Sequence, residues 1–150
     1  MTEFRVRSAD ERREDILLRA SGMGIDETFI ATLVDTFYMR VRAHPVLGPV
    51  FGAAITDWDP HLARMKDFWS SVALNSGRYS GRPVPAHMKH THIRNWHFNI
   101  WLALFHQTLI DTAKTPDAVV YFMERAERIG HSMQLALFDD AVFDPPLSRD

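Results

Sequence analysis

The chain carries the sequence PAHMKHTHIRNWH at residues 85–97, a stretch that holds four of its eight histidines. This stretch leads directly into a segment, about 95–112, in which Phe98, Trp101 and Phe105 recur at helical spacing. Imidazole is the commonest metal ligand among protein side chains. Four imidazoles beside an aromatic helix therefore indicate a bound metal or a metal-containing cofactor.

The composition limits the kind of site and partner. A chain of 150 residues suits one domain, and the absence of cysteine excludes disulfides, iron–sulfur clusters and thiolate zinc sites. The net charge of -2 lacks the basic excess of most nucleic-acid-binding domains. The first residues contain no apolar signal core, and no segment approaches the roughly 20 apolar residues that span a bilayer. We therefore expect a cytoplasmic protein with neither nucleic acid nor membrane as a partner.

Helical periodicity dominates from Ser8 to Phe138, and no segment shows the alternation of a strand. Ser8 and Asp26 stand at cap positions ahead of two helical segments. The sequence thus predicts an all-α fold in three parts: an N-terminal extension with a short helix at 1–25, a helical domain at 26–138, and a flexible C-terminal tail at 139–150.

The helical domain is expected to contain four main helices. The second of them has Pro60 in its first turn, where proline is tolerated, and ends at the Asn75-Ser76-Gly77 stop. Residues 47–51 are expected to form an apolar connector, and only a short helix fits around His87. The four helices are predicted at about 26–43, 57–74, 95–112 and 116–137.

An ordered set of motifs runs through this domain. The motifs are Phe37-Tyr38, Leu47-Gly48-Pro49-Val50-Phe51, His61 followed by Phe68-Trp69, Tyr79-x-Gly81-x-Pro83-x-x-x-His87, and His97-Phe98-x-x-Trp101-Leu102. The set resembles the truncated haemoglobins of group III, over roughly residues 26–137. The resemblance implies a shortened globin fold, with two helices packed over two, and haem b as the cofactor.

The resemblance also implies roles for individual residues. His87 matches the proximal ligand of the haem iron, and Tyr38 and Trp101 match distal positions that face the ligand. His61 matches a third distal position. The other pocket residues expected from the match are Phe51, Met65, Phe68 and Trp69, and Phe37 beside Tyr38 is also expected to bind the cofactor. Arg78 and Tyr79 are further candidates, because the haem propionates are carboxylates that suit nearby cations and hydrogen-bond donors.

The segment after the proximal position departs from the family. Many relatives carry prolines there, whereas this chain has His90 and His92. The alternative is a helical non-haem metal protein that uses His87, His90, His92 and His97, since these spacings could converge on one ion. A third interpretation is a helical binding or sensor module without a cofactor.

For the haem protein we expect tight binding of dioxygen or another diatomic ligand. Ligation by His87 on one side leaves the opposite iron position free for that ligand. Hydrogen bonds from Tyr38 and Trp101 would slow its release, which suits chemistry better than transport. Nitric oxide detoxification and peroxide chemistry are the two reactions considered, so enzymatic activity is left open and the redox partner is unknown.

Overall fold

The computed structural model of the chain describes residues 8–81, 87 and 93–138. Within these ranges the regular structure is entirely helical, which confirms the predicted all-α class. The helices are α1 (Ala9–Gly22), α2 (Glu27–Ala43), α3 (Leu47–Ala54), α4 (Trp58–Leu74), α6 (Asn95–Thr112) and α7 (Pro116–Phe138).

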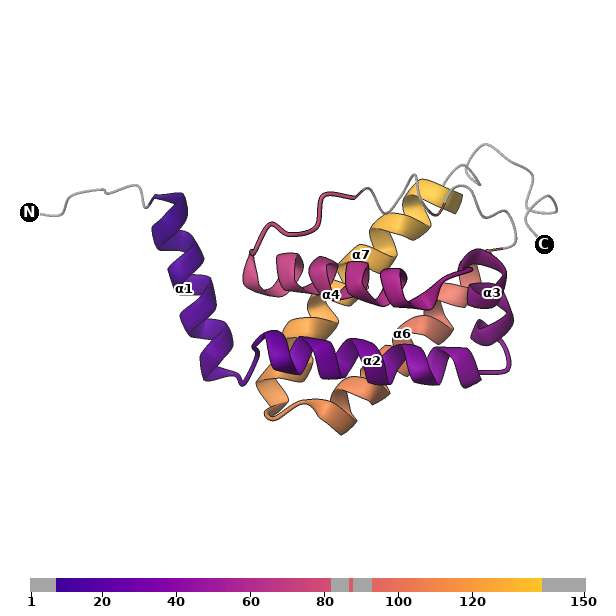
Figure 1. The fold of residues 1–150 in the computed structure, drawn as a ribbon, viewed down its shortest axis with the longest axis horizontal. Helices are drawn as coiled ribbons and strands as arrows, with labels where there is room; N and C mark the ends of the chain where they lie inside the picture. Colours follow the sequence, from indigo (N-terminus) through magenta and orange to yellow (C-terminus); the bar gives the residue numbers. More distant parts are fainter. Residues whose placement is uncertain (1–7, 82–86, 88–92, 139–150) are drawn as a thin grey trace, which may run out of the picture.

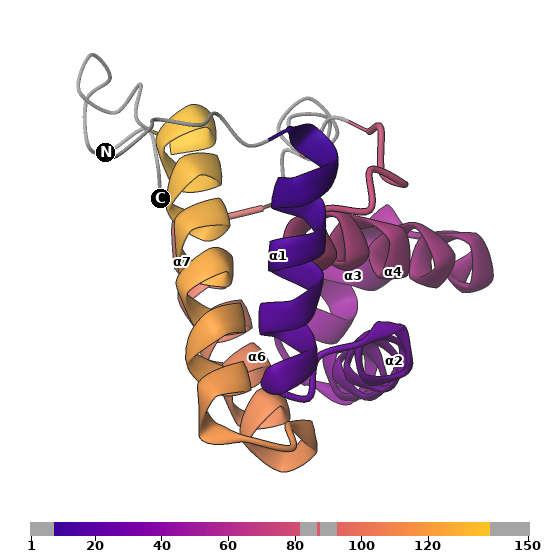
Figure 2. The same cartoon turned by 90° about the vertical axis from the view of Figure 1, so that its left-hand side faces the viewer.

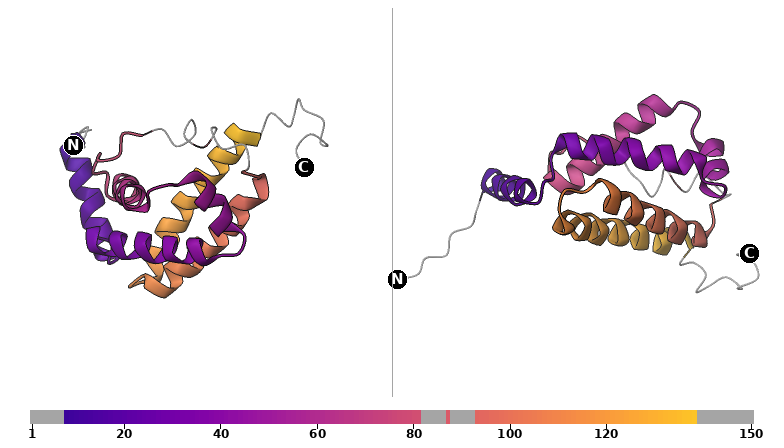
Figure 3. Two further views of the ribbon diagram at one scale, coloured as in Figure 1. Left: turned by 45° about the vertical axis from the view of Figure 1, so that its right-hand side comes forward. Right: turned by 90° about the horizontal axis from the view of Figure 1, so that it is seen from below.

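Two pairs of helices form two layers (Figure 1 and Figure 3). Helices α2 and α4 pack together in one layer, and α6 and α7 pack together in the other. Helix α2 also contacts α6, so it joins the layers, while α3 closes one end. Helix α1 projects from the opposite end of the bundle (Figure 2). The arrangement is the expected two-over-two sandwich with an additional N-terminal helix.

Side-chain caps begin several of these helices where the sequence predicted them. The Oγ of Ser8 accepts a hydrogen bond from the backbone N–H of Glu11 at 3.1 Å. A carboxylate oxygen of Asp26 accepts the N–H of Phe29 at 2.8 Å. Each cap satisfies an amide that has no partner inside its helix. At the other end of α4, Asn75 adopts the left-handed conformation, with φ 55°, and ends the helix.

The core lies where α2 meets α4, α6 and α7. The ring of Phe37 on α2 makes edge contacts with Trp101 and Phe105 on α6, at centroid distances of 5.4 and 5.1 Å. The ring of Trp69 on α4 stacks on Phe105 at 5.0 Å. Burial of these large side chains is the main driving force that holds the layers together.

The structure corrects the expectation for residues 47–51, which belong to α3 rather than to a connector. The Nδ1 of His44 accepts hydrogen bonds from the backbone N–H groups of Val46 and Leu47 and so supports the start of this helix. A Cβ on Gly48 would lie 2.8 Å from the carbonyl oxygen of Arg42. Only glycine therefore permits α3 to turn this closely against the end of α2.

Candidate functional site

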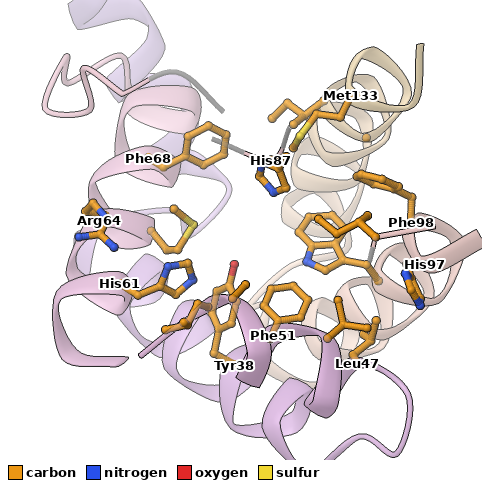
Figure 4. A pocket seen from close by; sticks show the side chains of 18 of the residues that line it. Tyr38, Leu47, Phe51, His61, Arg64, Phe68, His87, His97, Phe98 and Met133 are labelled. Atoms are coloured by element: carbon orange, nitrogen blue, oxygen red, sulfur yellow. The ribbon is translucent and has the colours of Figure 1, made fainter. Parts of the chain in front are cut away.

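A cavity of about 530 Å³ lies between the two layers, and helices α2, α3, α4, α6 and α7 all contribute to its wall (Figure 4). This volume is in the usual range for sites that bind an organic cofactor. The structure brings together on its wall these residues that the sequence nominated: Tyr38, Phe51, His61, Met65, Phe68, Trp69, Tyr79, His87 and Trp101.

Tyr38 supplies a hydroxyl group inside the cavity. Its side chain is 4% exposed, and Figure 4 shows its oxygen directed into the open space. Burial raises the pKa of this phenol above its usual value, so the hydroxyl keeps its proton and can act as a donor. The ring is held by edge contacts with Phe37 at 5.0 Å and with Phe51 at 6.0 Å.

His61 lies beside Tyr38 on the same side of the cavity, with 5.2 Å between the ring centroids (Figure 4). Burial, with the positive charge of Arg64 and then His87 as smaller causes, lowers the pKa of His61 to about 4. The imidazole is therefore neutral at neutral pH. Its Nε2 is buried and has no hydrogen-bond partner among the described residues. Buried polar atoms are rarely left in this state, so the atom indicates a place for a ligand.

His87 lies across the cavity from these two side chains, and its ring is directed into the same space (Figure 4). The neighbouring His90 and His92, predicted as metal ligands in the non-haem alternative, lie outside the described residues. Within the described part of the chain, no three histidine or carboxylate side chains are grouped as a metal site. The His87 imidazole faces a polar wall across the cavity. This arrangement suits a metal cofactor that takes one ligand from the protein and lies within the cavity.

Trp101 forms part of the wall on α6, and its ring is fixed on two sides. It stacks on Phe105 at 5.1 Å with an interplanar angle of 5°, and Phe37 contacts it edge-on. Such contacts leave the indole little freedom to rotate. The indole N–H is a donor only, so it can serve as a second hydrogen-bonding group for a ligand.

Two residues predicted to bind the cofactor, Phe37 and Arg78, are not among the residues that line the cavity. Phe37 is 1% exposed and packs against Tyr38 and Trp101, so it supports the distal residues from behind. The guanidinium of Arg78 pairs with Glu27 and with Asp67, the latter at 3.4 Å. These carboxylates account for the direction of the Arg78 side chain. Its contact with a propionate stays a prediction.

The cavity wall also includes residues that the sequence did not nominate as haem contacts. Arg64 lies one helical turn beyond His61 on α4, a spacing that could have identified it. His97, predicted as a ligand only in the non-haem alternative, lies in the first turn of α6, and its Nδ1 accepts the backbone N–H of Arg94 at 2.9 Å. Met133 comes from α7. The further members of this group are Phe98, Ile129 and Gly130.

We compared the chain with known proteins. No protein-family model matches it. It is 31% identical over 118 residues to the protein described as group 3 truncated hemoglobin ctb from Campylobacter jejuni, an alignment that covers 76% of this chain and 92% of that protein. The crystal structure of group III truncated hemoglobin from Campylobacter jejuni matches with a TM-score of 0.72 at 32% identity, with the same shares of the two chains covered.

The chain belongs to the group III truncated haemoglobins. The resemblance read from the motifs is thereby confirmed, and membership implies a haem cofactor and haem-based ligand binding. The residues present fit that group, because a large cavity has the His87 imidazole on one wall and the buried, unpartnered Nε2 of His61 on the other. The non-haem alternative is not favoured for this truncated haemoglobin. Among the described residues no helix is long and apolar enough to cross a membrane.

Proposed function

We propose that this truncated haemoglobin binds haem b through His87 and retains a diatomic ligand, dioxygen above all, at the wall formed by Tyr38, His61 and Trp101. The observation that carries the proposal is the placement of His87 opposite Tyr38 and His61 across one cavity (Figure 4). Haem, when bound, supplies an iron centre with one coordination position open to a diatomic ligand.

His87 would hold the iron through its imidazole. The remaining cavity wall on that side is apolar, with Phe98, Ile129 and Met133 as contributors. An apolar wall excludes water from the iron and packs against the faces of a large flat ring. Phe51, Phe68 and Met65 supply comparable apolar contacts from α3 and α4.

Arg64 and Tyr79 would contact the propionates of the cofactor. Both line the cavity, and Arg64 is exposed enough for its guanidinium to stay hydrated and charged. A guanidinium and a phenol are both donors that suit a carboxylate. Arg78, whose guanidinium already has two carboxylate partners, is a less suitable candidate than Arg64.

The distal donors would act on the ligand rather than on the cofactor. The Tyr38 hydroxyl is protonated and the Trp101 indole is a fixed donor, so both can bond to a ligand oxygen that carries partial negative charge. His61 is neutral and offers either a donor or an acceptor, according to its tautomer. Retention of the ligand follows from these bonds.

The reaction we propose is oxidation of nitric oxide by the retained dioxygen. One nitric oxide and one dioxygen combine to nitrate with one electron, which the ferrous iron would supply in a single turnover and an external one-electron reductant would replace. Reduction of peroxide to two water molecules, with two electrons from an external reductant and two protons from solvent, is the second candidate, because the same donors could polarise an oxygen–oxygen bond. Rapid mixing of the oxygenated protein with nitric oxide should give one nitrate per haem. A nitrate yield near zero would contradict the first reaction.

Absorption spectra of the purified protein test the cofactor itself. A haem protein shows a strong band near the violet edge of the visible range that shifts on reduction and on addition of carbon monoxide. Elemental analysis that finds metal without this band would instead support the non-haem interpretation. Protein with neither metal nor the band would support the module without a cofactor.

A further inference from the structure

An indole that the proposed function does not use contacts the distal side chains but is not among the residues that line the cavity. Trp58 is the first residue of α4, and its ring contacts His61 edge-on, with 5.6 Å between the centroids and an angle of 89°. It also contacts the ring of Tyr38, at 6.1 Å and 55°. Trp58 therefore touches both polar side chains on this side of the cavity.

No hydrogen bond from a described residue holds the Nε2 of His61. The ring is instead packed against Tyr38 and Trp58, both edge-on to it, and these two rings also contact each other. Trp58 precedes His61 by three residues on the same helix, a spacing that places their side chains on one face. The orientation of His61 therefore depends on aromatic contacts, and Trp58 supplies one of the two.

Arg42 fixes Trp58 from a different helix. The Cζ of its guanidinium lies 4.6 Å from the centroid of the indole ring, in the geometry of a cation–π contact. Arg42 is exposed and also borders a surface hollow, together with Met39 and Leu62. The guanidinium thus connects the end of α2 to the start of α4 on the outer side of the distal wall.

We propose that Trp58, held in place by Arg42, is a positioning residue that sets the orientation of His61 and thereby the retention of the ligand. The inference rests on the proposed function, because it assigns His61 to the ligand side of a haem cavity. It predicts that two residues outside the ligand's direct surroundings control how the ligand is held. Neither residue needs to touch the haem or the ligand.

Trp58→Leu tests the central contact. We expect the infrared stretch of the carbon monoxide complex to change from one band to several, because His61 gains more than one orientation. The dissociation rate of carbon monoxide should change by about threefold to tenfold, in the same direction as for His61→Leu measured alongside it. Trp58→Phe keeps an aromatic edge and should restore the single band.

A double-mutant cycle separates positioning from general loss of structure. If Trp58 acts through His61, Trp58→Leu should have no further effect on the rate or the band in a His61→Leu background. A general disturbance of the pocket would act equally in both backgrounds. An effect of Trp58→Leu that persists in the absence of His61 would therefore overturn the inference.

Arg42→Gln tests the outer support in a surface variant that should fold normally. We expect a partial change of the band and about a twofold change of rate. The control is Arg40→Gln on the same helix, because Arg40 pairs with Asp111 at 2.8 Å and not with the distal wall. Equal spectra for Arg42→Gln, Trp58→Leu and wild type would overturn this inference and leave the proposed function intact. A protein that forms no carbon monoxide complex would overturn the proposed function as well.

Discussion

Replacement of Tyr38 by phenylalanine removes one oxygen atom from the distal wall and leaves the rest of the side chain in place. The ring of Tyr38 is buried and is held by edge contacts with Phe37 and Phe51. These contacts do not involve the hydroxyl, so phenylalanine can occupy the same position. The variant therefore isolates the hydrogen bond that we assign to the hydroxyl.

The expected magnitude follows from the charge on the ligand. A hydrogen bond to a partly charged acceptor contributes about 1.5–3 kcal/mol. Since about 1.4 kcal/mol corresponds to a factor of ten, loss of this bond should speed release of dioxygen by about tenfold to a hundredfold. The association rate should change much less, because the bond forms only once the ligand is in place.

The assay is stopped-flow displacement of dioxygen from the ferrous protein by carbon monoxide. Tyr121→Phe is the matched control, because the Tyr121 hydroxyl donates to the carbonyl oxygen of Ala73 at 2.7 Å, outside the cavity. This control should lower the free energy of unfolding and leave the release rate unchanged. A release rate for Tyr38→Phe within twofold of wild type would refute the assigned role of the hydroxyl.

Three further predictions concern the second donor, the protonation states and the close approach of two helices. Trp101→Phe keeps an aromatic ring against Phe105 but removes the indole N–H, so dioxygen release should accelerate by about tenfold in the same assay. An unchanged release rate would show that this donor does not reach the ligand. Burial lowers the pKa of His61 to about 4 and raises the pKa of Tyr38, so both groups stay neutral from about pH 6 to pH 9. The dioxygen release rate should therefore be constant across that range, and a step near pH 6.5 would contradict this assignment. Gly48→Ala should lower the free energy of unfolding in urea by about 1–3 kcal/mol, because its Cβ would meet a carbonyl oxygen at 2.8 Å, whereas Gly52→Ala, with nothing within 4 Å, should not be destabilising.

Helix positions could be predicted from the sequence where two kinds of information coincide. Phe29, Leu33 and Phe37 recur every four residues on the buried face of α2, and the cap Asp26 marks where that helix begins. His61, Met65 and Phe68 are likewise spaced four and three residues apart on α4, and all three line the cavity. Local rules succeed here because the information lies within one helix.

What the sequence did not show depends on contacts that go beyond the pattern of one helix. Leu47–Ala54 reads as a connector because it is short and apolar, but it is a helix whose start is supported by the Nδ1 of His44 and whose Gly48 fits closely against the end of α2. The Arg78 guanidinium pairs with Glu27, 51 residues earlier, and local patterns do not identify a partner at that separation. The roles of Trp58 and Arg42 depend on the same kind of contact. The contact of Arg78 with a propionate stays a prediction.

The ligand to the iron can be tested directly by removing the His87 imidazole and then returning it in solution. The measurement is the absorption spectrum of ferrous His87→Gly, reconstituted with hemin and reduced, before and after addition of free imidazole. We predict that the five-coordinate histidine spectrum is lost and that free imidazole restores it, while His106→Ala, an exposed histidine on α6, keeps the wild-type spectrum. An unchanged spectrum in His87→Gly would contradict the assignment of His87 as the proximal ligand.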